Sequence, residues 1–272
     1  MSGRYFGVDG CAGGWALVEL VDGRPVTHLF VAEFAGVLER TRDARLVLVD
    51  IPIGLPDAAR GERRCDVLAR KVLGDRGSCV FPAPVREVLD LPERCTQEEA
   101  SARQRQLTGR GLTMQAYCLL RKIREVDGLM RHNPRLQETV RESHPELCFA
   151  ALNGGKPVQH GKLSREGRSE RLAVLRRYVP DVDAFIAGVP RSRRRGSPAA
   201  DDVLDALSLA VNAWLGSVRG FRVLPDEGEE LDRYGLRMEM VTARPDSAIP
   251  GGEAAAPGWP PRVGSSPAGH RE

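Results

Sequence analysis

Two aspartates stand at the ends of predicted strands. Asp9 closes the alternating segment Arg4–Asp9, and Asp50 closes the continuously apolar segment Arg45–Asp50. Open α/β sheets place their ligand sites beyond the carboxyl ends of strands. If these strands are neighbours, the two carboxylates emerge side by side, and a hard divalent cation such as Mg²⁺ would relieve their repulsion. Asp9 also suits a plain turn because a glycine follows it, whereas Asp50 ends a buried run and needs a partner.

A third acidic group lies in the predicted helix Ser197–Leu215, for which Ser197 is the expected N-cap. Asp202 and Asp205 are three residues apart and therefore share one helix face. Three or four carboxylates that clamp two metal ions would activate water and stabilise the leaving oxygen in phosphodiester cleavage. Asp201 and Asp202 also suit the first turn of a helix without any further role, because acidic groups stabilise its dipole. Asp205 lies a turn further in, among apolar residues, and favours a functional interpretation.

Three parts of the sequence together resemble the ribonuclease H-like superfamily. They are Tyr5–Gly10, the strand ending at Asp50 and the helix Asp202–Ala210. The last string is similar to the C-terminal helix of RuvC-type Holliday junction resolvases. Further strings resemble more closely a bacterial family of unknown function whose members are predicted RNase H-like nucleases. They are Gly7–Cys11, Gly13-Gly14-Trp15, Asp50–Pro56, Arg64–Asp66, Leu73-Gly74, Val80–Pro84 and Glu142–Glu146. The resemblance spans roughly residues 4–225.

The resemblance implies an α/β fold with a ribonuclease H-like mixed five-stranded sheet flanked by helices. It also maps four positions onto metal ligands for Mg²⁺ or Mn²⁺, namely Asp9, Asp50, Asp202 and Asp205. At the strand-end position of Asp50 the resolvases carry glutamate, so the shorter side chain here changes the reach to a metal. Glu142, on a predicted strand, is an additional catalytic candidate, although it is equally compatible with an exposed strand residue.

The pattern of apolar residues predicts the elements that position these side chains. Expected strands are Arg4–Asp9, Trp15–Leu20, Pro25–Val31, Arg45–Asp50 and Thr139–Ser143. Expected helices are Glu33–Arg42, Asp57–Leu73, Thr96–Leu107, Thr113–Arg131, Ser169–Tyr178 and Ser197–Leu215. Hairpins followed by strand–helix alternation indicate a mixed sheet. We therefore expect a core from residues 1–56 and 136–242, a helical insertion over 57–135, and a disordered tail over 243–272.

The formal net charge of +3 hides an uneven distribution. Residues 57–197 carry 28 basic and 18 acidic groups, whereas the flanking segments are acidic. Such asymmetry is compatible with a polyanionic partner, although 36 of the 40 basic residues are arginine and a general arginine bias also explains it. Candidate phosphate-binding residues are Arg64, Arg70, Arg76, Arg193, Arg194 and Arg195. Salt-bridged or solvated surface is the alternative for each of them.

Several classes of protein are excluded. No apolar run is long enough to cross a bilayer, and the N-terminus lacks the apolar stretch of a signal peptide. The six cysteines contain no C-x-x-C pair, so neither a disulfide framework nor structural zinc is indicated. We expect a cytoplasmic protein with no membrane contact. Because RuvC-type resolvases are often dimers, a homodimer is one option for the assembly.

The leading hypothesis is a Mg²⁺- or Mn²⁺-dependent nuclease that hydrolyses DNA or RNA. An ATP-dependent phosphotransferase of the sugar kinase–actin type is an alternative, because that group shares the core and begins with a strand-end Asp-Gly. The glycine turn at Gly13-Gly14 gives this alternative weak support. A non-catalytic module that binds nucleic acid or protein through the basic segment is a third hypothesis.

Overall fold

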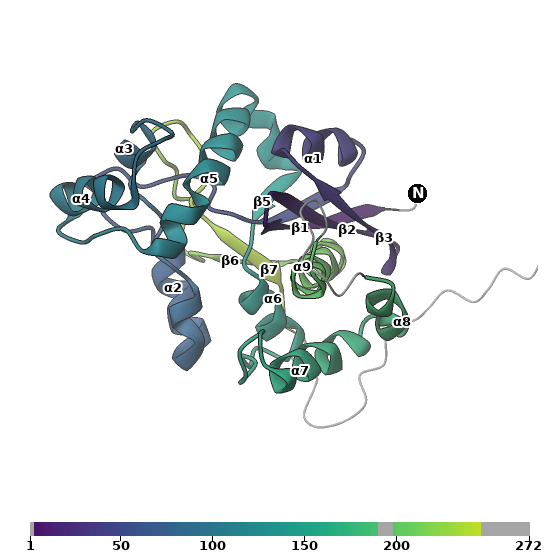
Figure 1. The fold of residues 1–272 in the computed structure, drawn as a ribbon. Coiled ribbons are helices and arrows are strands. Elements are labelled where there is room, and N and C mark those ends of the chain that lie inside the picture. Colours follow the sequence, from purple (N-terminus) through teal and green to yellow (C-terminus); the bar gives the residue numbers. More distant parts are fainter. Residues whose placement is uncertain (1–2, 190–197, 246–272) are drawn as a thin grey trace, which may run out of the picture.

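A computed structural model describes residues 3–189 and 198–245 of the chain. Its main sheet has five strands in the order β3-β2-β1-β4-β5 (Figure 1). They are β1 (Arg4–Cys11), β2 (Gly14–Val21), β3 (Arg24–Val31), β4 (Leu46–Asp50) and β5 (Val140–Glu142). The first three strands are antiparallel, while β4 runs parallel to β1 and β5 parallel to β4. The expected α/β fold with a mixed five-stranded sheet is confirmed.

Helices within the described residues flank this sheet. They are α1 (Phe34–Arg40), α2 (Arg64–Leu73), α3 (Arg86–Leu89), α4 (Gln97–Thr108), α5 (Met114–His132), α6 (Pro145–Leu152), α7 (Arg165–Arg176), α8 (Val182–Ala187) and α9 (Ala200–Arg219). Two 3-10 turns, η1 (Gly74–Cys79) and η2 (Pro134–Glu138), complete the helical elements. None of these described helices has the length and apolar character that crossing a membrane requires.

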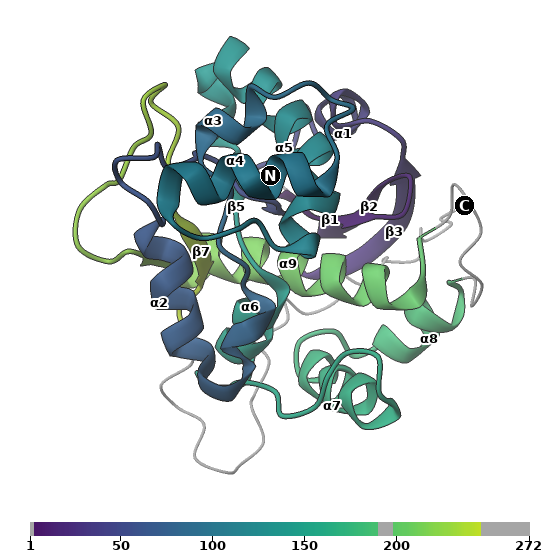
Figure 2. The ribbon, with the colours of Figure 1, turned by 60° about the vertical axis from the view of Figure 1, so that its left-hand side comes forward.

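Each face of the sheet is covered by a different layer. Helix α9 lies along one face, and α1 and α5 cover the other (Figures 1 and 2). Alternation along β1 explains this division, because Tyr5 joins the core beside α9 while Phe6 and Val8 join the core beneath α1 and α5. The sheet is therefore buried on both faces, as the apolar sequence of β4 predicts.

The hairpins form as their turn residues predict. Asp22 and Gly23 link β2 to β3 and both have positive φ, 49° and 81°, as a tight hairpin turn requires. Thr96 caps α4 and Glu99 returns the capping-box hydrogen bond. These are cases where local chemistry alone decides the backbone.

Other boundaries differ from the expectation. Helix α2 begins at Arg64 instead of Asp57, because residues 57–63 form turns that include Gly61 at φ 76°. Helix α7 begins at Arg165, where Ser164 is the N-cap, four residues before the predicted start. Helix α9 begins at Ala200 instead of at the predicted Ser197, which lies outside the described residues.

The sequence pattern also missed several short elements of the described residues. Helices α3, α6 and α8 were not expected, nor was a second sheet of β6 (Phe221–Leu224) and β7 (Met240–Ala243). The last residue of β7 lies within the segment predicted to be a disordered tail. Most of that segment, residues 246–272, lies outside the described residues.

Residues 57–135 contain helices and no strand within their fully described length, as expected. They do not pack as a separate body. Ile123 and Val126 of α5 belong to the same buried cluster as Phe6 and Val8 of β1. One core thus extends from the helical segment into the sheet.

Candidate functional site

The parallel pairing of β1 and β4 brings two predicted site residues together. Asp9 lies directly opposite Asp50 in the register of the two strands. Both side chains face α9, since Gly7 contacts α9 and Leu48 belongs to the core beside that helix. Asp9 is 5% exposed, and Asp50 is partly buried. Each carboxyl group lies close enough to the other to affect its pKa. They therefore lie side by side.

Helix α9 adds a third carboxylate, Asp205, which is 3% exposed. Its position depends on Gly7, because a Cβ at Gly7 would lie 1.8 Å from the backbone oxygen of Ala206 and 2.5 Å from the backbone nitrogen of Ala210. Only glycine permits so close an approach of strand and helix. We call Asp9, Asp50 and Asp205 the carboxylate site. It combines three segments that are distant in the sequence.

Lys162 is a member of the site that sequence reasoning missed. It lies in the loop between α6 and α7, and its Nζ donates to Asp205 Oδ2 at 2.7 Å. Its charge also acts on Asp9 and Asp50. A loop lysine has no periodic pattern around it, so nothing in the sequence indicates this contact.

Burial and mutual repulsion govern the electrostatics of the carboxylate site. Burial, followed by the nearby Asp205 and Asp50, raises the pKa of Asp9 well above its usual range. Burial likewise raises the pKa of Asp50, and it raises the pKa of Asp205 to about 6 even though Lys162 opposes the change. The pKa of Lys162 is itself raised, because the carboxylates outweigh its burial. One lysine does not compensate three clustered carboxylates.

The segment after β5 contributes two further polar groups. His144 is the N-cap of α6, and its Nδ1 accepts a hydrogen bond from the backbone N–H of Glu146. Glu146 lies close enough to raise the pKa of both Asp50 and Asp205. Its Oε1 accepts from Arg76 and Arg171, while its buried Oε2 has no partner among the described residues. Glu146 is thus a fourth acidic group at the edge of the site.

Asp202, a predicted metal ligand, has its side chain turned to the helix terminus. Its Oδ2 accepts from the backbone N–H of Ala199 at 2.8 Å. The negative charge of Asp202 nevertheless raises the pKa of Asp9. Asp202 therefore lies near the carboxylate site and also serves the start of α9.

Glu142, the additional catalytic candidate, is directed to the other face of the sheet. It pairs with Val49 in the register of β4 and β5 and so shares a face with Val49, not with Asp50. Both of its oxygens accept from Arg63, at 2.7 Å each, and Oε2 also accepts from the backbone N–H of Ile53. Arg63 is also paired with Asp66. We call Arg63, Asp66 and Glu142 the Arg63 cluster; it leaves Glu142 apart from the carboxylate site.

The predicted phosphate-binding arginines have different surroundings. Arg64 is exposed, and Arg70 is held by Glu62 and by the carbonyl of Val80. Arg76 reaches Glu146 and so borders the carboxylate site. Arg193, Arg194 and Arg195 lie outside the described residues.

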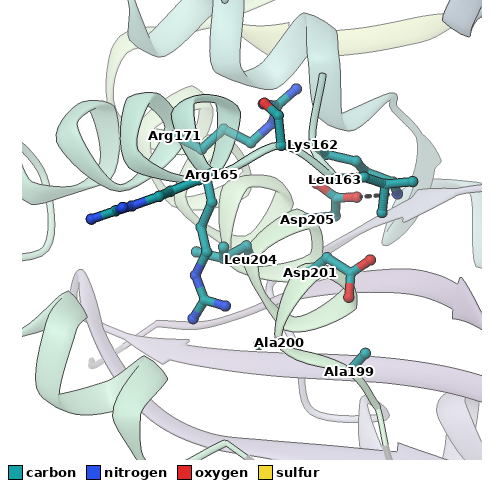
Figure 3. A pocket seen from close by; sticks show the side chains of 11 residues that line it. Lys162, Leu163, Arg165, Arg171, Ala199, Ala200, Asp201, Leu204 and Asp205 are labelled. Atoms are coloured by element: carbon teal, nitrogen blue, oxygen red, sulfur yellow. Dashed lines mark hydrogen bonds and ion pairs between the residues drawn. The ribbon is translucent and has the colours of Figure 1, made fainter. Parts of the chain in front are cut away.

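A cavity of 640 Å³ opens beside the carboxylate site, between α7 and the start of α9 (Figure 3). Lys162 and Arg165 line one side, and Leu204 and Asp205 line the other. In Figure 3 a dashed line marks the ion pair of Lys162 with Asp205. Asp205 therefore belongs both to the cavity and to the carboxylate site.

The residues present fit a divalent ion in their chemistry. Buried carboxylate oxygens in excess of nearby cations are what Mg²⁺ and Mn²⁺ prefer as ligands. The unpartnered Oε2 of Glu146 adds one more oxygen. Among residues 3–189 and 198–245, however, no three His, Cys, Asp or Glu side chains are already arranged to hold an ion. Asp205 is instead engaged by Lys162, and Asp202 by Ala199.

Comparison with known proteins places the chain in a family. Neither the curated proteins nor the solved structures include a match to it. A family model described as "Protein of unknown function (DUF429)" matches residues 7–230, which contain Asp9, Asp50 and Asp205. The matched segment covers most of the chain, and the protein therefore belongs to this family.

Proposed function

We propose that the protein is a divalent-metal-dependent nuclease of the ribonuclease H-like type, which hydrolyses phosphodiester bonds in nucleic acid. The observation that carries the proposal is the register of β1 and β4. It sets Asp9 opposite Asp50, beneath the buried Asp205 of α9. Buried like charges cost stability, and such clusters with shifted pKa values concentrate at functional sites.

Asp9, Asp50 and Asp205 would hold Mg²⁺ or Mn²⁺. When bound, such ions supply the Lewis-acid chemistry of phosphodiester hydrolysis. The side chains of the chain itself do the positioning. The ammonium group of Lys162 lies at the edge of the site, where it can contact a phosphate oxygen of the substrate as well as Asp205. His144 faces Asp50 with its Nδ1 occupied as an acceptor, so in the neutral ring the proton is on Nε2.

Cleavage assays test the proposal directly. Single-stranded DNA, RNA, a DNA–RNA hybrid and a four-way DNA junction are incubated with wild type in Mg²⁺, in Mn²⁺ or in EDTA. We expect cleavage with either ion, none in EDTA, and a loss of more than about 100-fold in Asp50→Asn. Asp43→Asn is the matched control, because Asp43 is an exposed aspartate outside the site. Absence of cleavage on every substrate, or equal rates in wild type and Asp50→Asn, would overturn the proposal.

A further inference from the structure

The cavity between α7 and the start of α9 carries more positive than negative side chains. Lys162, Arg165, Arg168 and Arg171 line it, against two carboxylates, Asp201 and Asp205. Lys162 and Asp205 offset each other as an ion pair, and Arg171 is paired with Glu146, so Arg165 and Arg168 remain against Asp201. The remaining surplus of positive charge makes the cavity suited to an anion.

Two of these arginines, Arg165 and Arg168, have guanidinium groups that can bind a ligand, and Arg171 lies buried behind them. The guanidinium groups of Arg165 and Arg168 are exposed and make no hydrogen bond or ion pair with any residue in the described part of the chain. Arg171 is 1% exposed, and its Nε has no partner there. Guanidinium groups match the geometry of phosphate oxygens and can donate to two of them at once. A phosphate is therefore the anion that this set recognises best.

The backbone around the cavity favours the same charge. Ser164 and Arg165, the N-cap and first residue of α7, both line the cavity. Helix α7 has 12 residues, and its positive dipole end lies here. Figure 3 shows Arg165 extending from this helix end toward Leu204 and the first turn of α9. The helix dipole thus adds to the arginines.

The volume of the cavity and its apolar residues further limit which phosphate-containing ligands fit. A volume of 640 Å³ lies within the usual range of small-ligand sites, roughly 300–1,000 Å³, and admits a single nucleotide. Duplex DNA is too wide, since its major groove alone spans about 12 Å. Leu204 lines the cavity, and Leu163 at its edge is 81% exposed. Leu163 offers an apolar surface to a base, while Leu204 is 3% exposed and closes the wall behind it.

We propose that this cavity binds one nucleotide of a single-stranded nucleic acid and that Arg165 and Arg168 hold its phosphate. Asp205 links the cavity to the carboxylate site, so the bound strand passes from the arginines to Asp9 and Asp50. This assignment of the substrate rests on the proposed nuclease function. It places the phosphate contacts on α7, which lies within the basic segment 57–197 but outside the insertion 57–135 that contains Arg64, Arg70 and Arg76.

Binding measured without catalysis tests the assignment. A fluorescein-labelled single-stranded hexanucleotide is titrated by anisotropy in EDTA, where no cleavage is expected. The double variant Arg165→Gln/Arg168→Gln should bind at least about 10-fold more weakly, and its salt slope should fall by about 0.7 for the one phosphate that is no longer neutralised. Arg176→Gln is the control, because Arg176 is an exposed arginine of α7 away from the cavity. It should bind within twofold of wild type.

The outcomes separate this inference from the proposed function. Unchanged binding in the double variant overturns the inference, even if Mg²⁺-dependent cleavage is found. Weakened binding in the double variant, with no cleavage of any substrate, supports the inference and overturns the nuclease. A blunt duplex of the same sequence that binds as tightly as the single strand overturns the choice of a single strand. ATP that competes more strongly than the hexanucleotide would also overturn it, in favour of a nucleoside triphosphate.

Discussion

The carboxylate site and the Arg63 cluster are both buried and both ionic, but their carboxylate oxygens have hydrogen-bond and ion-pair partners to different degrees. In the Arg63 cluster one guanidinium donates to both oxygens of Glu142 and to both oxygens of Asp66. Backbone N–H groups of Ile53 and Ala83 complete the acceptors. In the carboxylate site a single lysine, 44% exposed, contacts one of three carboxylates.

This difference separates structural from functional ion clusters. A fully hydrogen-bonded cluster fixes the chain segments that meet in it, and here hydrogen bonds satisfy two carboxylates that share one guanidinium. A cluster with surplus charge costs stability and persists where a ligand or reaction needs it. Residue type alone does not distinguish the two, because each combines a carboxylate at a strand end with an aspartate from a helix. Four experiments test this difference between the two clusters.

The largest effect is expected in the Arg63 cluster. Arg63→Met leaves Glu142 and Asp66 as buried carboxylates without a cation, and should lower the free energy of unfolding by about 3–5 kcal/mol. Urea unfolding monitored by circular dichroism measures this loss. The neighbouring Arg64 is exposed, so Arg64→Met should change stability by less than about 0.5 kcal/mol. Similar losses in the two variants would contradict a structural role for the cluster.

A smaller effect is expected from the strand that supports the carboxylate site. Gly7→Ala forces a methyl group against the backbone of Ala206 and Ala210, and overpacking of this kind costs about 1–3 kcal/mol. Metal-dependent cleavage should fall as well, because α9 must shift and carry Asp205 away from Asp9. Gly128→Ala is the control, since a methyl group there meets open space on α5. Wild-type stability and cleavage in Gly7→Ala would contradict the close contact of β1 and α9.

Within the carboxylate site itself, the removal of a charge should stabilise the protein instead of destabilising it. Asp9→Asn removes one of the repelling charges and is expected to stabilise the metal-free protein by about 1 kcal/mol while it abolishes cleavage. Glu142→Gln, a change of the same kind in the Arg63 cluster, should destabilise the protein. Urea unfolding in EDTA compares the two. Equal destabilisation by both variants would show that the carboxylate site is as well satisfied as the Arg63 cluster.

The smallest effect concerns Lys162. Because its ammonium is partly exposed, Lys162→Met should cost no more than about 1 kcal/mol in EDTA. Without its lysine partner, Asp205 should bind a metal cation better. Mg²⁺ should therefore raise the melting temperature of the variant more than that of wild type. Differential scanning fluorimetry with and without Mg²⁺ measures both shifts. An equal or smaller shift in Lys162→Met would mean that the lysine does not compete with a cation.

Local patterns in the sequence predicted the sheet and all three residues of the carboxylate site, since the helix spacing and apolar neighbours of Asp205 also singled it out. The alternation of β1, the Asp22-Gly23 turn and the apolar run of β4 each reflect short-range chemistry that any chain with these residues would share. Asp9 and Asp50 follow from them, because strand ends locate side chains once the strands are neighbours.

The other polar residues around the carboxylate site depend on tertiary contacts that have no local pattern. Lys162 and Glu146 reach the carboxylate site from a loop and from an unexpected helix, and their sequence surroundings are unremarkable. Glu142 illustrates the opposite case. A strand assignment was correct there, but the face of the sheet depends on a register that one sequence does not fix.

The contribution of α9 has a consequence for the order in which the chain is made. Asp9 and Asp50 leave the ribosome long before Asp205, and synthesis proceeds from the N-terminus. Until α9 emerges and docks on β1, the two strand-end carboxylates lack their third partner and the cavity lacks a wall. Any property that depends on Asp205 therefore appears only after α9 has been synthesised and has docked on β1.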